Sequence, residues 1–497
     1  MKVIVKYYII YVIFFVRKRY SMKVCLISPK PNMKSKDSSS SYSNLGIGYI
    51  ASLLKDHKHE VYLYDGNVQE FSKDDWIEFL TNSVYEVFGI SVYEYNYFDA
   101  IAILNQIRKY QSSSFVFFGG YYSTFYYNSI LSKLDIVNCC VLGEGEITCC
   151  ELINHLSANS DWHTLKGIAF RNAIGEVVCT GLSNVINHLD DIPFPTRVVP
   201  AAFLEKISMI SSRGCYEDCI ICSVPYFRTN KQIRLRSPQN IVDELLFLKR
   251  KYNSITRFDF MDNNLLLGIP EKKEWIDEFI GLLKKIEFSI QFSVFARPVD
   301  VCFHKNKLQE LQAVGLNMVF LECHSFMDRQ LEFLCKNTTV EANNLAIFAL
   351  EECGINYSIQ LSLFEPTTFL EELRMQLDCL ASIFVNQSLD NNQLPLSFHK
   401  RIYPLCKSMF NDYYVKQNLS RHNYYQDTQM YSLEVILLEW QTMVNKIYIG
   451  TIKQRQFLLA DLDFVIDTCD KLPELCNSEA ITIHLDYWYQ HILMCCS

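Results

Sequence analysis

The sequence predicts an α/β protein: a doubly wound parallel sheet, then a partial (β/α) barrel, then a mostly helical C-terminal region. Three observations predict this order. Between residues 22 and 158, short apolar runs alternate with amphipathic stretches, as in a parallel sheet covered by helices. Between residues 206 and 410, strand and helix patterns alternate again, and polar residues follow the strands. From about Asn411 to residue 497, long amphipathic stretches with many tyrosines indicate helices.

The first 21 residues are expected to lie outside this fold. Residues 7–16 form an apolar run that is too short to span a bilayer as a helix, and no small-residue cleavage site follows it. The run 22–29 then has the pattern of a first strand. We expect translation to start at Met22 and the leader to be an artefact of start-site choice; an interfacial anchor is the alternative.

The first domain is predicted over residues 22–158. Its predicted strands are 24–28, 61–64, 87–92, 115–118 and 136–142, and its predicted helices are 45–55, 76–82, 98–110 and 147–156. Ligands of doubly wound sheets bind beyond the carboxyl ends of the strands. A dinucleotide fingerprint is superficially matched at Gly46-x-Gly48-x-x-Ala51, but about 17 residues separate it from the strand, which disfavours a nicotinamide site.

Residues 159–205 are predicted to form a hairpin and a linker. Residues 167–171 and 175–178 have the pattern of two short strands. Pro193 and Pro195 stiffen the linker, because proline fixes φ and lacks a backbone donor.

The barrel is predicted over residues 206–410. Ser237 is expected to cap a helix over 241–248 whose first turn accepts Pro238. The predicted strands that follow are 255–261, 289–295, 318–321 and 355–363. Because the carboxyl ends of barrel strands collect on one face, the polar residues that follow them are expected to meet there.

Three cysteines, Cys215, Cys219 and Cys222, lie in the spacing Cys-x3-Cys-x2-Cys. Three thiolates in one short loop, with no fourth ligand nearby, predict a cubane iron–sulfur cluster that keeps one iron open. A zinc knuckle is an alternative, although it prefers four closed ligands. A chance match is another, because the chain has 19 cysteines.

Composition favours an intracellular, cytoplasmic enzyme of several domains. Hydrophobic residues make up 49% of the chain and aromatic residues 14%, which argues against disorder. The formal charge of −8, without a basic stripe, gives no electrostatic footprint for nucleic acid. The cysteines are scattered without secretory context, so reduced thiols are expected, and the pairs at 139–140, 149–150 and 495–496 are expected to be small buried hydrophobic residues.

The cysteine spacing and the ordered features after it resemble the radical S-adenosylmethionine (SAM) superfamily. There the open iron of a [4Fe-4S] cluster binds SAM, and an electron from the cluster cleaves it to a 5'-deoxyadenosyl radical. The resemblance implies that the three cysteines hold the cluster. It also implies SAM contacts from Asp262 and Asn263 to the amino group, from Arg297 to the carboxylate and from Glu322 to the ribose or methionine portion.

Residues 44–51, 118–120 and 142–146 resemble segments of the cobalamin-binding, Rossmann-like domains that precede a radical SAM barrel. Glycines in such a site let a corrin ring approach the backbone. The residues that the resemblance assigns to cobalamin are Asn44, Gly46, Gly48, Asp65, Asn67, Gly119, Gly120, Gly143, Glu144 and Gly145. Where histidine-ligating domains carry Asp-x-His-x-x-Gly, this chain has Asp65-Gly66-Asn67, so cobalt is expected to be bound without a protein imidazole. A domain that has lost the cofactor is the alternative.

The resemblance therefore implies a cobalamin-dependent radical SAM enzyme, similar to class B methyltransferases, that methylates an unactivated carbon of a peptide or secondary-metabolite substrate. A radical cyclase, epimerase or rearranging enzyme with the same cofactors is the alternative among enzymes, and a non-catalytic cobalamin or cluster sensor is the alternative outside them. The expected partner is an electron donor such as flavodoxin or ferredoxin, with neither nucleic acid nor membrane. The sequence identifies no catalytic side chain, substrate or oligomeric state.

Overall fold

The computed structural model describes residues 21–30, 43–199, 206–219, 222, 224, 233–262, 264–361, 372, 375, 376, 379 and 396–398. Two compact units make up the chain: residues 1–216 with 223–262, and residues 217–222 with 263–497. The predicted helical region 411–497 lies outside the described residues, as does nearly all of the leader.

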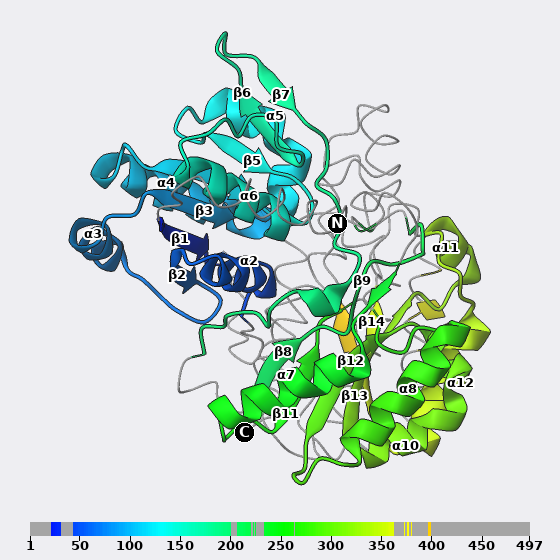
Figure 1. Cartoon of the computed structure of the whole chain (residues 1–497). Helices are drawn as coiled ribbons and strands as arrows, with labels where there is room; N and C mark the ends of the chain where they lie inside the picture. Colours follow the sequence, from blue (N-terminus) through cyan, green and yellow to red (C-terminus); the bar gives the residue numbers. More distant parts are fainter. Residues whose placement is uncertain are drawn as a thin grey trace, which may run out of the picture. The chain divides into compact units, whose positions relative to one another are not determined.

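A seven-stranded sheet forms the core of the first unit, in the order β2-β1-β3-β4-β5-β6-β7 (Figure 1). Strands β1 to β5 are parallel, whereas β6 and β7 are antiparallel to their neighbours. The strands are β1 (Lys23–Ser28), β2 (Glu60–Asp65), β3 (Val87–Ser91), β4 (Phe115–Gly119), β5 (Cys139–Val141), β6 (Ile168–Arg171) and β7 (Val177–Cys179). The order 2-1-3-4-5 is that of a doubly wound sheet whose ligand site lies at the carboxyl ends of β1 and β3, the neighbouring strands from which the connections leave in opposite directions. The predicted sheet is confirmed, and the predicted hairpin extends its edge.

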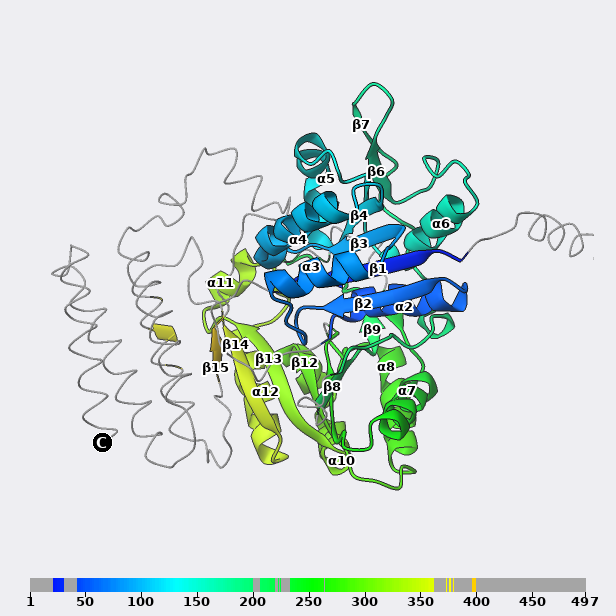
Figure 2. The ribbon, with the colours of Figure 1, turned by 90° about the vertical axis from the view of Figure 1, so that its left-hand side faces the viewer.

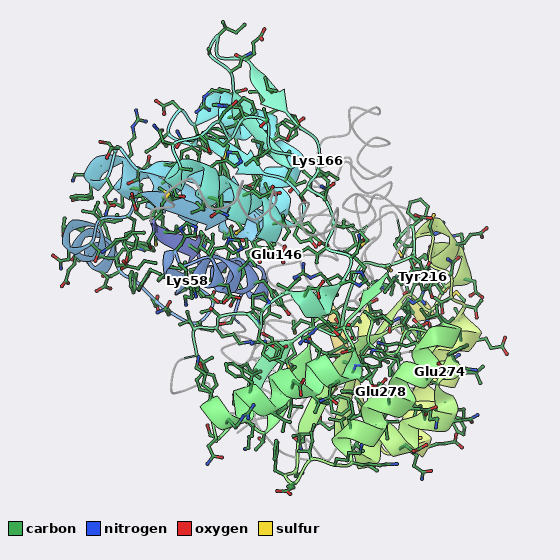
Figure 3. All side chains as sticks on the ribbon, in the orientation of Figure 1. Lys58, Glu146, Lys166, Tyr216, Glu274 and Glu278 are labelled. Carbon is green, nitrogen blue, oxygen red and sulfur yellow. The ribbon has the colours of Figure 1, made fainter. Side chains whose placement is uncertain are left out.

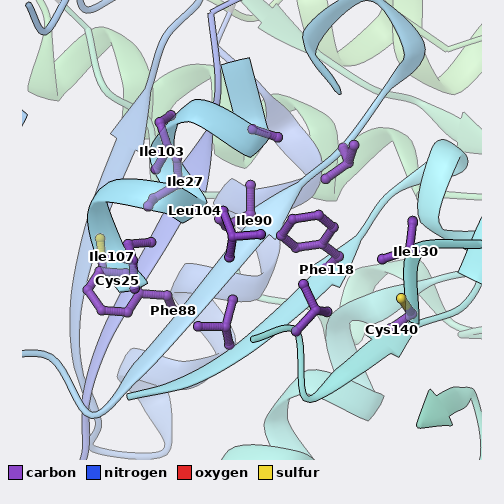
Figure 4. Close-up of a cluster of buried hydrophobic side chains, with 14 of the residues drawn as sticks. Cys25, Ile27, Phe88, Ile90, Ile103, Leu104, Ile107, Phe118, Ile130 and Cys140 are labelled. Carbon is purple, nitrogen blue, oxygen red and sulfur yellow. The ribbon is translucent and has the colours of Figure 1, made fainter. Parts of the chain in front are cut away.

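Helices cover both faces of this sheet. Those on one face are α2 (Leu45–Asp56) and α6 (Gly145–Ser157), and those on the other are α3 (Lys73–Asn82), α4 (Tyr97–Tyr110) and α5 (Tyr121–Lys133). A 3-10 turn (Glu94–Asn96) precedes α4, and another (Leu189–Asp191) lies in the linker. Figure 4 shows the core under α4, where Ile103 and Leu104 face Phe118 and Ile90 of the sheet.

Helix α5 is absent from the sequence prediction. Its first seven residues are tyrosine, phenylalanine, serine and threonine, which favour strands or caps over helices. Tyr126 has non-helical angles (φ −116°, ψ 20°), so the helix is kinked there. The tertiary fold stabilises it by burying Ile130 and Leu131 against the sheet.

The paired cysteines of the first domain are buried, as predicted. Cys139 and Cys140 on β5 and Cys149 and Cys150 on α6 are free thiols in the core. Burial raises the pKa of the Cys139 thiol well above its ordinary value, which makes it unreactive.

The first unit also contains the beginning of the second sheet. Its further elements are β8 (Lys206–Met209), β9 (Ser212–Arg213), β10 (Arg234–Leu235), α7 (Pro238–Lys251) and β11 (Arg257–Phe260). Strands β8 and β11 are parallel, and β9 and β10 form an antiparallel pair. Ser237 caps α7 by accepting a hydrogen bond from the Asn240 amide at 3.1 Å, and Pro238 lies in its first turn, as predicted.

The second unit continues the strand and helix alternation. Strands β12 (Gln291–Ala296), β13 (Leu316–His324), β14 (Asn356–Leu361) and β15 (Leu396–Phe398) pair in sequence order, all parallel. The helices are α8 (Pro270–Leu283), α9 (Pro298–Phe303), α10 (Leu308–Ala313), α11 (Asp328–Phe333) and α12 (Val340–Glu352), with a 3-10 turn at Lys305–Lys307. Figure 2 shows β12, β13 and β14 side by side. The parallel sheet predicted for a partial barrel is confirmed.

No helix within the described ranges is long and apolar enough to cross a membrane.

Replacement of Gly89 by alanine is expected to destabilise the first sheet. A Cβ atom on this β3 residue would lie 2.3 Å from Phe117 Cζ and 2.8 Å from Leu26 Cδ2, both in the core. We expect a loss of about 1–3 kcal/mol in a denaturant titration, because overpacked side chains must shift. Gly281→Ala in α8 is the matched control: its Cβ would meet no described atom within 4 Å, and helix propensity should add about 1 kcal/mol. Equal effects of the two substitutions would contradict the packing argument.

Candidate functional site

A polar cluster lies at the carboxyl edge of the first sheet, at the ends of β1 and β2. Asn44 caps α2, and its side-chain Nδ2 donates to Ser28 Oγ at 3.0 Å. The carboxylate of Asp65 accepts from the amide of Asn44 at 2.6 Å and from the amide of Asn67 at 3.1 Å. Burial raises the pKa of Asp65, and these amides partly oppose the rise. The structure therefore brings together Asn44, Asp65 and Asn67, as predicted from their strand ends.

The glycines assigned to the cofactor have different surroundings. A Cβ on Gly48 would lie 2.4 Å from the Thr196 carbonyl oxygen, so this glycine lets the linker pack against α2. Gly120 and Gly143 have φ of 91° and 83°, which favours glycine without any ligand. In contrast, a Cβ on Gly119 would meet no described atom within 4 Å. Gly119 is thus the predicted glycine whose surroundings leave room for a bound group.

The remaining two glycines lie at the starts of helices. A Cβ on Gly46 would be 3.3 Å from Asn44 Oδ1, and one on Gly145 would be 3.3 Å from Ile50 Cδ1. At both glycines an added Cβ would therefore contact another residue of the first domain.

An aromatic stack at the same edge was not among the predicted site residues. The rings of Tyr93 and Tyr95 stack with centroids 5.2 Å apart, and Tyr121 lies 5.9 Å from Tyr93. Tyr95 and Tyr121 are 44% and 40% exposed, which is high for large aromatic side chains at a sheet edge. The chain has 30 tyrosines, so the sequence pattern alone does not single out these three. The order of the strands brings them together at this edge.

None of the three cysteines of the motif forms a disulfide. Cys219 is buried, Cys215 and Cys222 are half-buried, and the Cys222 amide donates to the Cys219 carbonyl at 3.1 Å. Among the described residues, no three His, Cys, Asp or Glu side chains are arranged around one metal ion. A cubane cluster binds cysteines through separate irons, so it does not require that arrangement. Figure 3 shows Tyr216, which follows Cys215.

Asp262 holds the chain immediately before the cysteines. Its carboxylate accepts from the Ser211 amide at 2.9 Å, from Ser211 Oγ at 2.6 Å and from Ser212 Oγ at 2.8 Å. The residue is only 5% exposed. The sequence predicts a SAM contact for Asp262, whereas in this structure its carboxylate fixes the turn between β8 and β9. Asn263 lies outside the described residues.

Arg297 binds a residue inside the cysteine motif, and both residues belong to the second unit. It forms ion pairs with Glu217, which lies between Cys215 and Cys219, and with Asp300 at 2.5 Å. Glu217 also accepts from Asn337 Nδ2 at 2.6 Å. All three ionised side chains are buried. The predicted SAM contact of Arg297 stays a prediction, and the structure adds a second role, which is to hold Glu217.

Glu322 lies on β13, and its carboxylate is 3.8 Å from Lys336 Nζ. The Glu322 side chain is 30% exposed, so part of it remains accessible to a ligand beside Lys336.

Glu144 is engaged by arginines that flank the cysteines. Arg234 Nη1 donates to its carboxylate at 2.8 Å, and Arg213 Nη1 lies 3.5 Å from it. Burial alone would raise the pKa of Glu144, but the arginines outweigh burial and the net pKa is lowered. Glu144 is therefore ionised and paired.

Arg297→Met is expected to destabilise the protein by about 3–5 kcal/mol, because Glu217 and Asp300 would remain buried without their cation. Arg108→Met is the control. Arg108 pairs with Asp135 at 3.2 Å on the surface, where the loss is about 0–1 kcal/mol. Denaturant unfolding measures both, and a loss at Arg297 no larger than at Arg108 would contradict its buried role.

Comparison with protein families identifies the first sheet. Residues 37–153 match the model of the B12 binding domain. Two curated relatives match more of the chain. An uncharacterized methyltransferase of Pyrococcus horikoshii is 25% identical over 318 residues, which cover 63% of this chain and 67% of the relative. An anaerobic magnesium-protoporphyrin IX monomethyl ester cyclase of Rubrivivax gelatinosus is 24% identical over 353 residues, which cover 67% and 61%. The chain thus spans 61–67% of the length of these relatives.

Two solved structures share the fold. The cobalamin-dependent S-adenosylmethionine radical enzyme OxsB, with aqua-cobalamin bound, superimposes with a TM-score of 0.74 at 18% identity, covering 95% of this chain and 76% of OxsB. The radical S-adenosylmethionine methyltransferase TsrM from Kitasatospora setae gives a TM-score of 0.65 at 17% identity, covering 80% and 75%.

The order of the first sheet, the match over residues 37–153 and the parallel strands after the cysteines agree with one another. The chain therefore contains a B12-binding domain and has the fold of the cobalamin-dependent radical SAM enzymes.

Proposed function

We propose that this chain is a cobalamin-dependent radical SAM enzyme that methylates an unactivated carbon of a peptide or secondary-metabolite substrate. The observation that carries the proposal is the presence, in one chain, of a B12-binding domain and of three cysteines in the spacing Cys-x3-Cys-x2-Cys. Methyltransferases among its relatives and structural neighbours support the choice of reaction.

The residues present fit these cofactors. Cys215, Cys219 and Cys222 form no disulfide and would hold a [4Fe-4S] cluster. The space at Gly119 lies at the same carboxyl edge of the sheet as Asn44 and Asp65, and it would admit cobalamin at the edge where doubly wound sheets bind ligands. Together the cofactors supply the radical and the methyl group, and the protein supplies position and exclusion of water.

The chain's own residues would position the reacting groups. Asp262 fixes the turn before Cys215 through three hydrogen bonds. Arg297 and Asn337 hold Glu217 within the motif, which orders the backbone that carries the second cysteine. The Glu322 side chain is 30% exposed and would contact SAM.

An electron donor such as flavodoxin or ferredoxin is the proposed partner, and the proposed location is the cytoplasm.

A cyclase is the second candidate, because the Rubrivivax gelatinosus relative is a cyclase and matches two thirds of the chain. The products distinguish the reactions. Methyl transfer gives both S-adenosylhomocysteine and 5'-deoxyadenosine from SAM, whereas 5'-deoxyadenosine without S-adenosylhomocysteine would support a cyclase or rearranging enzyme. No SAM cleavage under strong reductant would support a sensor.

Simultaneous replacement of Cys215, Cys219 and Cys222 by alanine is expected to abolish both iron binding and SAM cleavage. After anaerobic reconstitution, iron and sulfide per chain are measured, followed by 5'-deoxyadenosine formed with dithionite. Cys179→Ala is the control, because Cys179 is an exposed free thiol on β7. If the triple variant still bound iron, the assignment of the cluster to these three cysteines would be wrong.

Gly119→Leu is expected to weaken hydroxocobalamin binding by at least about tenfold, a loss of about 1.4 kcal/mol, while leaving the apoprotein stable. The reason is that the new side chain would occupy the space beside Gly119. Absorbance titration of the apoprotein measures the affinity. Gly48→Ala should behave differently and lower stability, because its Cβ would lie 2.4 Å from the Thr196 oxygen. Unchanged affinity in Gly119→Leu would place cobalamin elsewhere.

A further inference from the structure

Two arginines face each other on the strands that enclose the cysteine motif. Arg213 on β9 and Arg234 on β10 are direct cross-strand partners in the antiparallel pair. The chain between them, residues 214–233, contains Cys215, Cys219 and Cys222. Like charges directly opposite each other destabilise a strand pair, so this pairing requires a counter-charge.

Glu144 supplies that counter-charge from the loop after β5. Arg234 binds both of its carboxylate oxygens, Nη1 at 2.8 Å and Nη2 at a shorter distance. Arg213 Nη1 lies 3.5 Å from the same carboxylate. Glu144 thus contacts both arginines of the pair. Its side chain is 19% exposed and that of Arg234 is 7% exposed, so solvent screens the pair weakly.

Glu146 completes the charge balance. Its carboxylate is 2.6 Å from Arg213 Nη2, and its side chain is 5% exposed. Two cations and two anions, each with a side chain at most 19% exposed, therefore form one neutral cluster. The ring of Tyr49 on α2 lies 4.9 Å from the Arg213 guanidinium carbon, which adds a cation–π contact.

The linker also contacts the cluster. Arg234 Nη1 donates to the Ile186 carbonyl at 2.7 Å, and the Ile186 amide donates to Glu144 at 3.3 Å. The B12-binding domain, the linker and both ends of the cysteine segment meet at these four charged side chains. All of these contacts lie within the first unit.

We propose that Glu144 and Glu146 are positioning residues that close the β9–β10 pair and thereby set the conformation of residues 214–219, which follow β9 and carry Cys215 and Cys219. The sequence resemblance assigns Glu144 to cobalamin, but its carboxylate oxygens are occupied by Arg234 and Arg213. Closure of the β9–β10 pair by these glutamates does not depend on any cofactor. The effect of this closure on the binding of an iron–sulfur cluster rests on the proposed function.

The charge arithmetic gives a specific test. Glu144→Gln leaves Arg213 and Arg234 opposite each other with one carboxylate, so β9 and β10 should separate. In the double variant Glu144→Gln with Arg234→Met, Arg213 still pairs with Glu146 at 2.6 Å, and one cation again faces one anion. The second substitution should therefore repair the defect of the first. If Glu144 only contributed to overall stability, the additional loss of Arg234 would make the double variant less stable than Glu144→Gln alone.

The first measurement uses the full-length apoprotein without cofactors. Alkylation of Cys215 by iodoacetamide is followed by peptide mass spectrometry, with the exposed Cys179 as the internal standard. We expect the Cys215 rate to rise about tenfold in Glu144→Gln, equal to about 1.4 kcal/mol of local opening, and to return near the wild-type rate in the double variant. Asp135→Asn is the matched control, because it also removes one carboxylate that pairs with an arginine, but on the surface. An unchanged rate in Glu144→Gln, or a double variant that is worse than the single one, overturns the proposal.

The second measurement follows cluster assembly. In Glu144→Gln, iron per chain after anaerobic reconstitution should fall, and the electron paramagnetic resonance spectrum of the reduced cluster should broaden. Both should recover in the double variant. If wild-type protein binds no iron, the proposed function fails, while the alkylation rates still test the closure.

Arg234→Lys keeps the measurement available if Glu144→Gln does not fold. Lysine retains the charge but cannot bind both oxygens of Glu144 in the same planar geometry. Faster alkylation of Cys215 than in wild type supports the closure, and an unchanged rate contradicts it.

Discussion

Buried carboxylates must be paired, and this constraint organises the residues around the cysteine segment. An unpaired buried carboxylate costs several kcal/mol, so each one fixes the donors around it. Glu244 on α7 is fully buried and pairs with Arg197 of the linker at 2.6 Å and with Arg236 at 2.5 Å. The same arginines donate to the carbonyls of Ser208 and Ile210, which lie on and after β8. One carboxylate thus links the linker, β8 and the residue after β10.

Asp262 and Glu144 extend the same arrangement toward the cysteines. Asp262 gathers the backbone and hydroxyl groups of Ser211 and Ser212, and Glu144 gathers the arginines of β9 and β10. Charge pairing therefore fixes β9 and β10, the two strands that flank the cysteine segment. Hydrogen bonds to charged groups are stronger than neutral ones.

Strand order, rather than charge pairing, fixes the position of the ligand edge of the first sheet. The connection after β1 leads to β2 on one side, and the connection after β3 leads to β4 on the other side. Space at Gly119 and the exposed rings of Tyr95 and Tyr121 lie at this edge and suit a flat, partly polar ligand. This combination agrees with the B12-binding domain matched over residues 37–153.

The sequence by itself determined the elements whose signals are local. The alternating pattern located the parallel strands, and Ser237 with Pro238 located the start of α7, because caps and periodicity act within a few residues. The cysteine spacing likewise needs only eight consecutive residues. Helix α5 could not be found this way, because its stability comes from burial of Ile130 and Leu131. Only the tertiary structure decided that Gly48 packs on the linker, that Asp262 holds Ser211 and that Glu144 binds Arg234. These partners are 148, 51 and 90 residues apart, and a sequence pattern carries no information about contacts that the fold creates over such distances.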